Sequence, residues 1–267
     1  RDGDRGTNMG FLSILNRIQQ VFEAERSKLE QTSIQLTEVV TANLVPEAGD
    51  GMPDSELLDQ AARFYSDRFD SLNGGLQGAP KFPSSLPLRF LFRYYRRTGK
   101  KAFLQIAEQT LEKMAAGGMY DQAGGGFHRY TVDAQWQVPH FEKMLYDNAL
   151  LAVAYLEGFQ LTGKRQYRKT VTEILRYVSR DMTTPAGAFY SATDADSLTP
   201  DGHREEGYYF TWTPTELEAI LGRTRAEIAQ SFYDVKPGGN FEGRSILNTP
   251  RPLENVASSL GMTEREL

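Results

Sequence analysis

The sequence predicts an all-α fold, namely an incomplete (α/α)6 toroid of helical hairpins with a short β-hairpin inserted in one loop. Apolar residues recur at helical spacing along most of the chain. The segment TGKKAF at 98–103 returns as TGKRQY at 162–167, an offset of 64 residues, and glycine-bearing loops recur near 74, 125, 187 and 238. We interpret these features as a hairpin unit repeated about every 50–60 residues, with coincidental helix spacing as the alternative.

Composition restricts the function classes. The 267 residues are 40% hydrophobic and 24% charged, which is typical of a soluble globular protein. A net charge of −5 argues against general nucleic-acid binding. There is no apolar run long enough for a membrane span and no visible secretory signal, so we expect a cytoplasmic protein. The absence of cysteine excludes disulfides and thiolate chemistry within this sequence. We expect no cofactor.

Three regions are predicted. Residues 1–44 contain helical periodicity, residues 45–54 have the composition of a linker, and residues 55–267 form the toroid domain. A capping box at 263–266 starts a helix just where the sequence stops. We therefore expect this chain to be part of a longer protein, in which further hairpins complete the ring.

Within the third region, helices and two strands follow one another. Glycine after Thr98 and Thr162 ends two of the helices, and a capping box at Thr213 with proline at the next position opens another. Aromatic and threonine residues predict strands at 188–196 and 207–213. The predicted helices are 56–69, 88–97, 102–116, 139–161, 166–182 and 214–222.

The predicted helix at 139–161 points to a site. Its first turns carry His140, Lys143 and Asp147 on one face, whereas the remainder is apolar nearly all round and should be buried. The positive end of the helix dipole would face a polar space at the N-terminal end of this helix, and the loop at 124–138 would lie across the entrance to that space.

The candidate site residues come from this region and from the neighbouring loops. Histidine titrates near neutrality and can move a proton, and paired carboxylates can cleave a glycosidic bond. Aromatic faces bind sugar rings, and cations bind their polar groups. The alternatives are that the histidines hold loops, that the carboxylates cap turns and fix loops, with Asp147 paired to Lys143 or Arg129, and that the aromatics are core. The candidates for catalysis are His128, His140, Glu142, Asp147, Asp194 and Asp196. The candidates for substrate binding are Lys81, Arg129, Tyr130, Trp136, Lys143 and Tyr146. No metal site is expected, because these residues lack ligand spacing.

Several long stretches resemble a known family. GAPKFP, GGMYDQAGGGFHRYTVDAQWQVPHFEKMLYDNA, FYSATDADS and EEGYYFTWT occur in this order. They are similar to the DUF255 proteins, the spermatogenesis-associated protein 20-like (YyaL-type) family. The resemblance implies a thioredoxin-like domain followed by a toroid similar to six-hairpin glycosidases and N-acylglucosamine 2-epimerases. Residues 10–29 resemble the closing helix of the thioredoxin-like domain, whose body is absent here, as are the final hairpins.

Two functions remain open at this point. The first is a carbohydrate-active enzyme, either a sugar epimerase or isomerase or a glycosidase-like hydrolase, that uses histidine and carboxylate acid–base chemistry on a small carbohydrate. The second is a non-catalytic sugar-binding or protein-interaction module that works with the thioredoxin-like domain. A deep cavity with perturbed acid–base groups would distinguish the first from the second.

Overall fold

The computed structural model describes residues 9–44, 54–83 and 87–267, which form two compact units, Arg1–Asp54 and Ser55–Leu267. The predicted linker lies almost entirely outside the described residues. The first unit contains α1 (Phe11–Ala24) and α2 (Arg26–Leu44), and neither helix buries a residue. Its origin in a thioredoxin-like domain stays a prediction.

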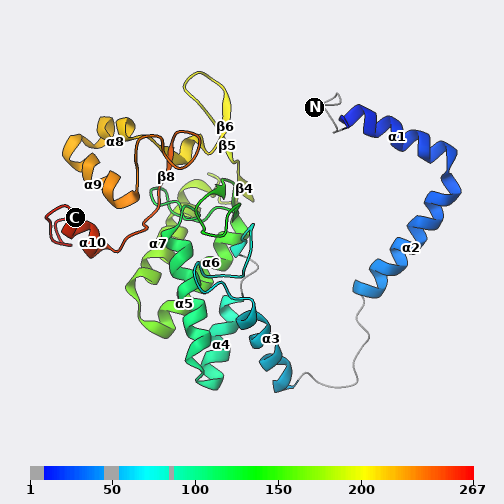
Figure 1. Ribbon diagram of the computed structural model, residues 1–267, viewed down its shortest axis with the longest axis horizontal. Helices are drawn as coiled ribbons and strands as arrows, with labels where there is room; N and C mark the ends of the chain where they lie inside the picture. Colours follow the sequence, from blue (N-terminus) through cyan, green and yellow to red (C-terminus); the bar gives the residue numbers. More distant parts are fainter. Residues whose placement is uncertain (1–8, 45–53, 84–86) are drawn as a thin grey trace. The chain divides into compact units, whose positions relative to one another are not determined.

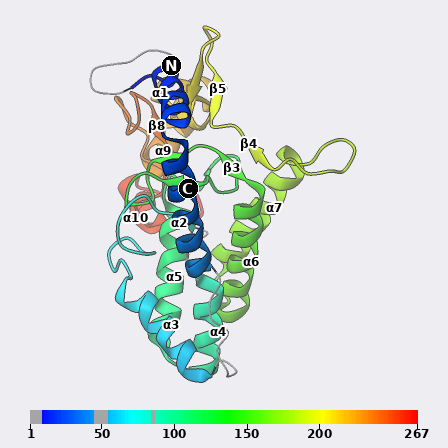
Figure 2. The same ribbon diagram turned by 90° about the vertical axis from the view of Figure 1, so that its right-hand side faces the viewer.

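Helical hairpins form the second unit, which confirms the predicted all-α fold class (Figure 1). Helices α4 and α5 pair through a short turn, α6 and α7 pair in the same way, and α4 also packs against α6. Figure 2 shows α6 and α7 side by side, with β5 projecting far from the α4–α5 turn. The helices are α3 (Ser55–Asp67), α4 (Leu88–Thr98), α5 (Lys101–Ala116), α6 (Leu145–Thr162), α7 (Arg165–Asp181), α8 (Pro214–Leu221), α9 (Arg223–Tyr233) and α10 (Leu253–Ser259).

The two TGK segments form the same turn. Gly99 and Gly163 both adopt the left-handed conformation, with φ of 71° and 72°, and each N–H bonds at 2.8 Å to the carbonyl four residues earlier. The hydroxyls of Thr98 and Thr162 also donate to the carbonyl four residues earlier, at 2.8 and 2.7 Å. This shared geometry supports a true internal repeat rather than a chance similarity.

The main core lies between these hairpins. Gly158 on α6 lets Phe92, Leu111 and Tyr167 approach, since an added Cβ would meet each of them at 3.2–3.3 Å. One face of α6 stays exposed, however, through Leu150, Val153 and Leu156, so the prediction that this helix is buried all round is wrong. The largest fully buried side chains are Trp136, Tyr155, Tyr167, Phe92, Phe127, Phe141 and Lys143.

Short strands occupy the loops that carry the candidate site. The antiparallel pairs are β1 (Tyr130–Thr131) with β2 (Pro139–His140), β3 (Lys143–Met144) with β4 (Ala192–Thr193), β5 (Asp196–Leu198) with β6 (Arg204–Glu206), and β7 (Thr211–Trp212) with β8 (Ser245–Ile246). The predicted β-hairpin therefore exists as β5–β6, but its strands are shorter than expected. Part of the predicted second strand, Tyr208–Phe210, is instead a 3₁₀ turn after Gly207.

The helix predicted from residue 139 begins only at Leu145. His140 and Lys143 are in extended segments, because β2 pairs with β1 and β3 pairs with β4. The predicted helical face shared by His140, Lys143 and Asp147 is therefore wrong. Asp147 alone of the three lies in the first turn of α6.

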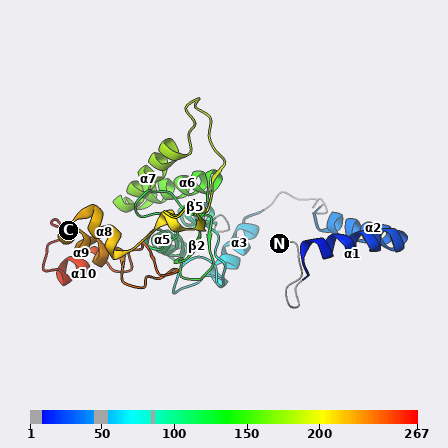
Figure 3. The same ribbon diagram turned by 90° about the horizontal axis from the view of Figure 1, so that it is seen from above.

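The C-terminal helices gather beside the hairpins (Figure 3). The predicted capping box of Thr213 and Glu216 is present at the start of α8, confirming that helix start. Thr263 also contacts Glu266, at 2.8 Å between hydroxyl and carboxylate, but only a turn follows. Within the described ranges, we find no helix with the length and apolarity needed to cross a bilayer.

Candidate functional site

Two loops of the second unit share one construction, which we call the lysine clamp. The first clamp joins Lys81 to Asp70 and Gly74, and the second joins Lys143 to Asp121 and Gly125. Lysine Nζ lies 2.7 Å from the aspartate Oδ2 in both, and 2.7 and 2.9 Å from the glycine carbonyl oxygen. The aspartate and the glycine are displaced by 51 residues between the two clamps. The repeat thus extends into the long loops.

Each clamp aspartate also organises its own loop. One carboxylate oxygen accepts two backbone N–H bonds, at 3.1 and 2.9 Å for Asp70 and at 3.0 and 2.8 Å for Asp121. Burial favours the protonated form of Asp70, but the bonds from Lys81 and Asn73 outweigh it and bring the pKa to about 2. The pKa of Asp121 is also lowered: burial opposes this, and the charge of Lys143 prevails.

Lys81 and Lys143 are therefore buried and paired in the structure. Only 4% and 1% of their surfaces are exposed, and their ammonium groups are occupied by the clamps. Trp136, another predicted binding residue, is fully buried and donates from Nε1 to the Asn73 carbonyl at 3.0 Å. A substrate-binding role for these three residues stays untested, and their contacts favour the alternative that they hold the loops.

His128 is likewise buried, with 1% of its surface exposed. Its Nδ1 lies 3.0 Å from the Phe141 carbonyl oxygen, and the rings of Phe141 and Phe210 contact its own ring edge to face. Burial and the nearby charge of Lys143 lower its pKa to about 3, so the imidazole is neutral at pH 7. These contacts favour the loop-holding alternative for His128.

His140 lies in a partly exposed cluster. Its Nδ1 lies 2.6 Å from Glu206 Oε1 and its Nε2 lies 3.4 Å from Glu142 Oε2. Glu142 in turn pairs with Arg129 at 2.9 Å. Hydrogen bonds from Arg129 to Glu142 and Tyr146 raise the pKa of the guanidinium. Of the predicted residues, His140, Glu142, Arg129 and Tyr146 are thus brought together.

An aromatic stack adjoins this cluster. The Tyr130 ring stacks on Phe82 at a centroid distance of 4.7 Å and lies 5.2 Å from the ring of His140, its partner across β1 and β2. Phe82 is 37% exposed, and Tyr146 is about half exposed. The stack forms a partly accessible aromatic face next to an acid–base group.

The two predicted carboxylates of the hairpin reach the cluster indirectly. Asp196 stands opposite Glu206 in the β5–β6 register. The carboxylate of Asp194 pairs instead with Arg204 at 2.5 Å and is 66% exposed. Asp196 therefore lies beside the partner of His140, and Asp194 is occupied within the hairpin.

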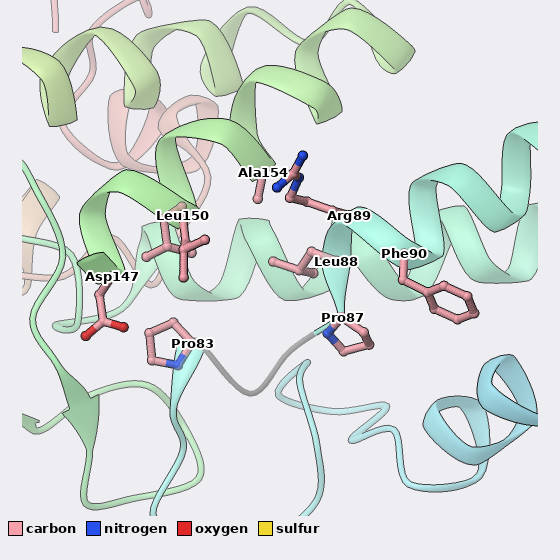
Figure 4. A pocket seen from close by; sticks show the side chains of 9 residues that line it. Pro83, Pro87, Leu88, Arg89, Phe90, Asp147, Leu150 and Ala154 are labelled. Carbon is pink, nitrogen blue, oxygen red and sulfur yellow. The ribbon is translucent and has the colours of Figure 1, made fainter. Parts of the chain in front are cut away.

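Asp147 differs from all the other candidates. Only 1% of it is exposed, and neither carboxylate oxygen accepts a hydrogen bond within the described part of the chain. Burial raises its pKa to about 6, although Arg129 opposes the shift. The alternative that Asp147 pairs with Lys143 is wrong, because Lys143 is held by Asp121. Figure 4 shows the Asp147 carboxylate at one end of a pocket between α6 and the start of α4.

Three contributors were missed at the sequence level: Glu206, Asp121 and Phe82. The 51-residue offset between the two loops could have identified Asp121 as the counterpart of Asp70. The spacing from Asp70 to Gly74 is the same as the spacing from Asp121 to Gly125. No comparable signal marks Glu206 or Phe82. In the described ranges, no three histidine or acidic side chains are grouped so that they could hold a metal ion.

Comparisons with known proteins extend these observations. No protein-family profile matches the chain. Human spermatogenesis-associated protein 20 is 36% identical over 284 residues, covering 96% of the chain and 36% of the relative. The mouse protein of the same name is 34% identical with the same coverage. An uncharacterised protein of Caenorhabditis elegans is 32% identical, covering 99% of the chain and 38% of that relative.

Solved structures give weaker likenesses. A sugar epimerase from a ruminal bacterium matches with a TM-score of 0.45 and 15% identity, over 67% of the chain and 55% of that structure. Cellobiose 2-epimerase from Spirochaeta thermophila matches with a TM-score of 0.45 and 15% identity, over 72% and 58%. Scores this low carry no conclusion about activity. The sequence comparisons do, however, confirm the predicted relationship: the chain is a homologue of spermatogenesis-associated protein 20, matched over nearly all of its own length and little more than a third of the length of those relatives.

Proposed function

We propose that the protein acts on a small carbohydrate by acid–base chemistry at His140. The observation that carries the proposal is the 2.6 Å contact between His140 Nδ1 and Glu206 Oε1 beside a partly exposed aromatic face. Histidine is the side chain best suited to proton transfer near neutral pH. A carboxylate on one ring nitrogen fixes the orientation of the imidazole, so that the other nitrogen, Nε2, faces Glu142 and can exchange a proton on that side.

The second nitrogen defines where the reaction would occur. Nε2 of His140 lies near Glu142, and Arg129 holds the carboxylate of Glu142 by an ion pair. An epimerase or isomerase would use Nε2 to remove or return the proton on a carbon next to a sugar carbonyl. A glycosidase would instead need one protonated and one ionised carboxyl group across the bond. The histidine-centred arrangement favours proton transfer at carbon over glycoside hydrolysis.

The stacked rings of Phe82 and Tyr130 would bind the sugar. Sugar rings pack their C–H faces on aromatic rings, and the Phe82–Tyr130 stack offers a partly exposed aromatic surface beside His140. Arg129 and Tyr146 add polar groups to the same cluster. A bound sugar would thus place its ring against the Phe82–Tyr130 stack and a reacting carbon near His140.

The second function, a non-catalytic module, is favoured by the buried state of His128, Lys81 and Lys143. Residues that look reactive in the sequence can be structural here. Turnover distinguishes the two functions, because a binding module shows a thermal shift with a sugar but no product.

The test is a screen of the full-length protein against mono- and disaccharides, by thermal shift and then by turnover. His140→Gln should reduce turnover at least 100-fold, the lower range expected for loss of a general acid–base group. His203→Gln is the matched control, because the His203 side chain is 78% exposed in the hairpin turn. Equal loss in both variants, or no turnover of any sugar by the wild type, would reject catalysis at His140.

A further inference from the structure

The Asp147 carboxylate lines a small pocket with otherwise mostly apolar walls. The pocket has a volume of about 140 Å³ and lies between α6 and residues at the start of α4 (Figure 4). Its walls include Pro83, Leu88, Leu151 and Ala154. The carboxylate is buried and accepts no hydrogen bond from any described residue. A polar group in this state is costly unless something else supplies a donor.

No cation among the described residues forms an ion pair with Asp147. The charge of Arg129 acts on it, but the Arg129 guanidinium is ion-paired to Glu142. Arg89, at the other end of the pocket, is paired with Glu157 at 2.9 Å. At pH 7 the carboxyl group is mostly ionised, because even its raised pKa of about 6 lies below that pH.

We propose that this pocket binds the primary ammonium group of a small molecule, with Asp147 accepting its hydrogen bonds and the apolar walls enclosing a compact body. A hydroxyl group could also donate, but it would leave the buried negative charge uncompensated. An ammonium group both donates and neutralises, and charge-assisted bonds are about twice as strong as neutral ones. The inference is independent of the sugar chemistry at His140.

The volume limits the size of the ligand. A cavity of about 150 Å³ accommodates a benzene ring, so this pocket suits a body of about six carbon atoms. Cyclohexylamine is a fitting probe, and cyclohexanol is its neutral counterpart of nearly equal shape.

The experiment is calorimetric titration of the protein with both probes at pH 7.5. Cyclohexylamine should bind at least tenfold more tightly than cyclohexanol. Asp147→Asn keeps the shape and removes the charge, so it should weaken amine binding at least tenfold and leave cyclohexanol within about threefold. Asp201→Asn, an exposed acid in the hairpin turn, is the control and should change neither affinity.

A pH series on the wild type keeps the test independent of any variant. Amine affinity should fall as the pH is lowered through about 6, where Asp147 takes up a proton. Three results would each overturn the proposal: equal affinities for the two probes, amine binding that is unchanged in Asp147→Asn, or no amine binding at an amine concentration of about 10 mM. That concentration lies above the dissociation constants of ordinary small-ligand complexes. Sugar turnover with no amine binding would reject this site while leaving the function proposed for His140 intact.

Discussion

Glu206 Oε1 lies 2.6 Å from His140 Nδ1, although 66 positions separate the two residues in the sequence. The contact joins β2, in the loop before α6, to β6 of the projecting hairpin. Glu206→Gln should therefore reduce kcat at least tenfold in any reaction that uses His140, because the amide cannot stabilise a protonated imidazole.

Stability should respond little to the same substitution. Both side chains are partly exposed, and such pairs contribute about 0–1 kcal/mol. Glu205→Gln is the matched control, since Glu205 lies next to Glu206 on the same strand and opposite Ser197. If both variants keep full activity, Glu206 does not position His140.

Breaking the second lysine clamp should destabilise the fold. Lys143→Met leaves Asp121 buried without its partner, which should lower the free energy of unfolding by about 3–5 kcal/mol. Urea denaturation measures the loss. Lys143→Met with Asp121→Asn should recover part of it, because no unpaired charge then remains.

Lys169→Met is the control for this substitution. Lys169 is exposed and pairs loosely with Glu173 at 3.8 Å, so its loss should change stability by no more than about 0.5 kcal/mol. Equal effects for Lys143 and Lys169 would contradict the structural role of the clamp.

The dependence of stability on pH should show two opposing contributions. His128 has a folded pKa of about 3 against an ordinary 6.5, so the stability it supports is lost as the pH falls through that window. Asp147 has a raised pKa of about 6 against an ordinary 3.8, so stability rises as the pH falls through 6 toward 3.8. Each slope is about 1.4 kcal/mol per pH unit, and the two should nearly cancel between about pH 6 and 4.

Asp147→Asn separates the two contributions. The variant should be more stable than the wild type at pH 7, by roughly 2–3 kcal/mol, because the buried charge is gone. It should also lose stability by about 1.4 kcal/mol per unit as the pH falls from 6 to 4, since the contribution of His128 is then no longer opposed by that of Asp147. If the stability of Asp147→Asn depends on pH between 6 and 4 as little as that of the wild type, the opposing contributions of Asp147 and His128 are refuted. Asp70 and Asp121, whose pKa values are lowered, contribute only below about pH 4.

Gly126 should tolerate no side chain. It has φ of +80°, and an added Cβ would lie 2.5 Å from a ring carbon of Tyr177. Gly187 has a similar φ of +85° but no heavy atom within 4 Å of the added Cβ. Both alanine variants bear backbone strain of about 1 kcal/mol, and Gly126→Ala should lose about 1–3 kcal/mol more through overpacking. Thermal unfolding of the pair measures this difference, and equal losses would rule out the clash.

Local signals in the sequence predicted the helices well. Apolar periodicity and the TGK turns located α4, α5 and α7 within a residue or two, because these features act between near neighbours in the chain. Pro139 misled the prediction. Proline is favoured at the first position of a helix, but here it pairs with Thr131 across β1 and β2. Pairing with β1, eight residues earlier in the chain, overrode the preference of proline for a helix start.

The candidate site was predictable only in part. The concentration of polar residues before α6 pointed to the region in which the structure brings His140, Glu142 and Arg129 together. Whether a given side chain is exposed could not be predicted in the same way. Lys81 and Lys143 look like binding residues in sequence, yet burial depends on contacts with Asp70 and Asp121 that only the folded chain brings together.

The lysine clamps have a mechanical consequence. Each ties a long loop to the extended segment that leads toward the next helix, so that loop and segment must move as one piece. Beyond the second clamp, the β5–β6 hairpin carries Glu206 with no buried ion pair of its own among the described residues. The hairpin is therefore the part of the site near His140 that we expect to move. Amide hydrogen exchange should be fast in residues 196–206 and slow in the loops that the two lysines anchor.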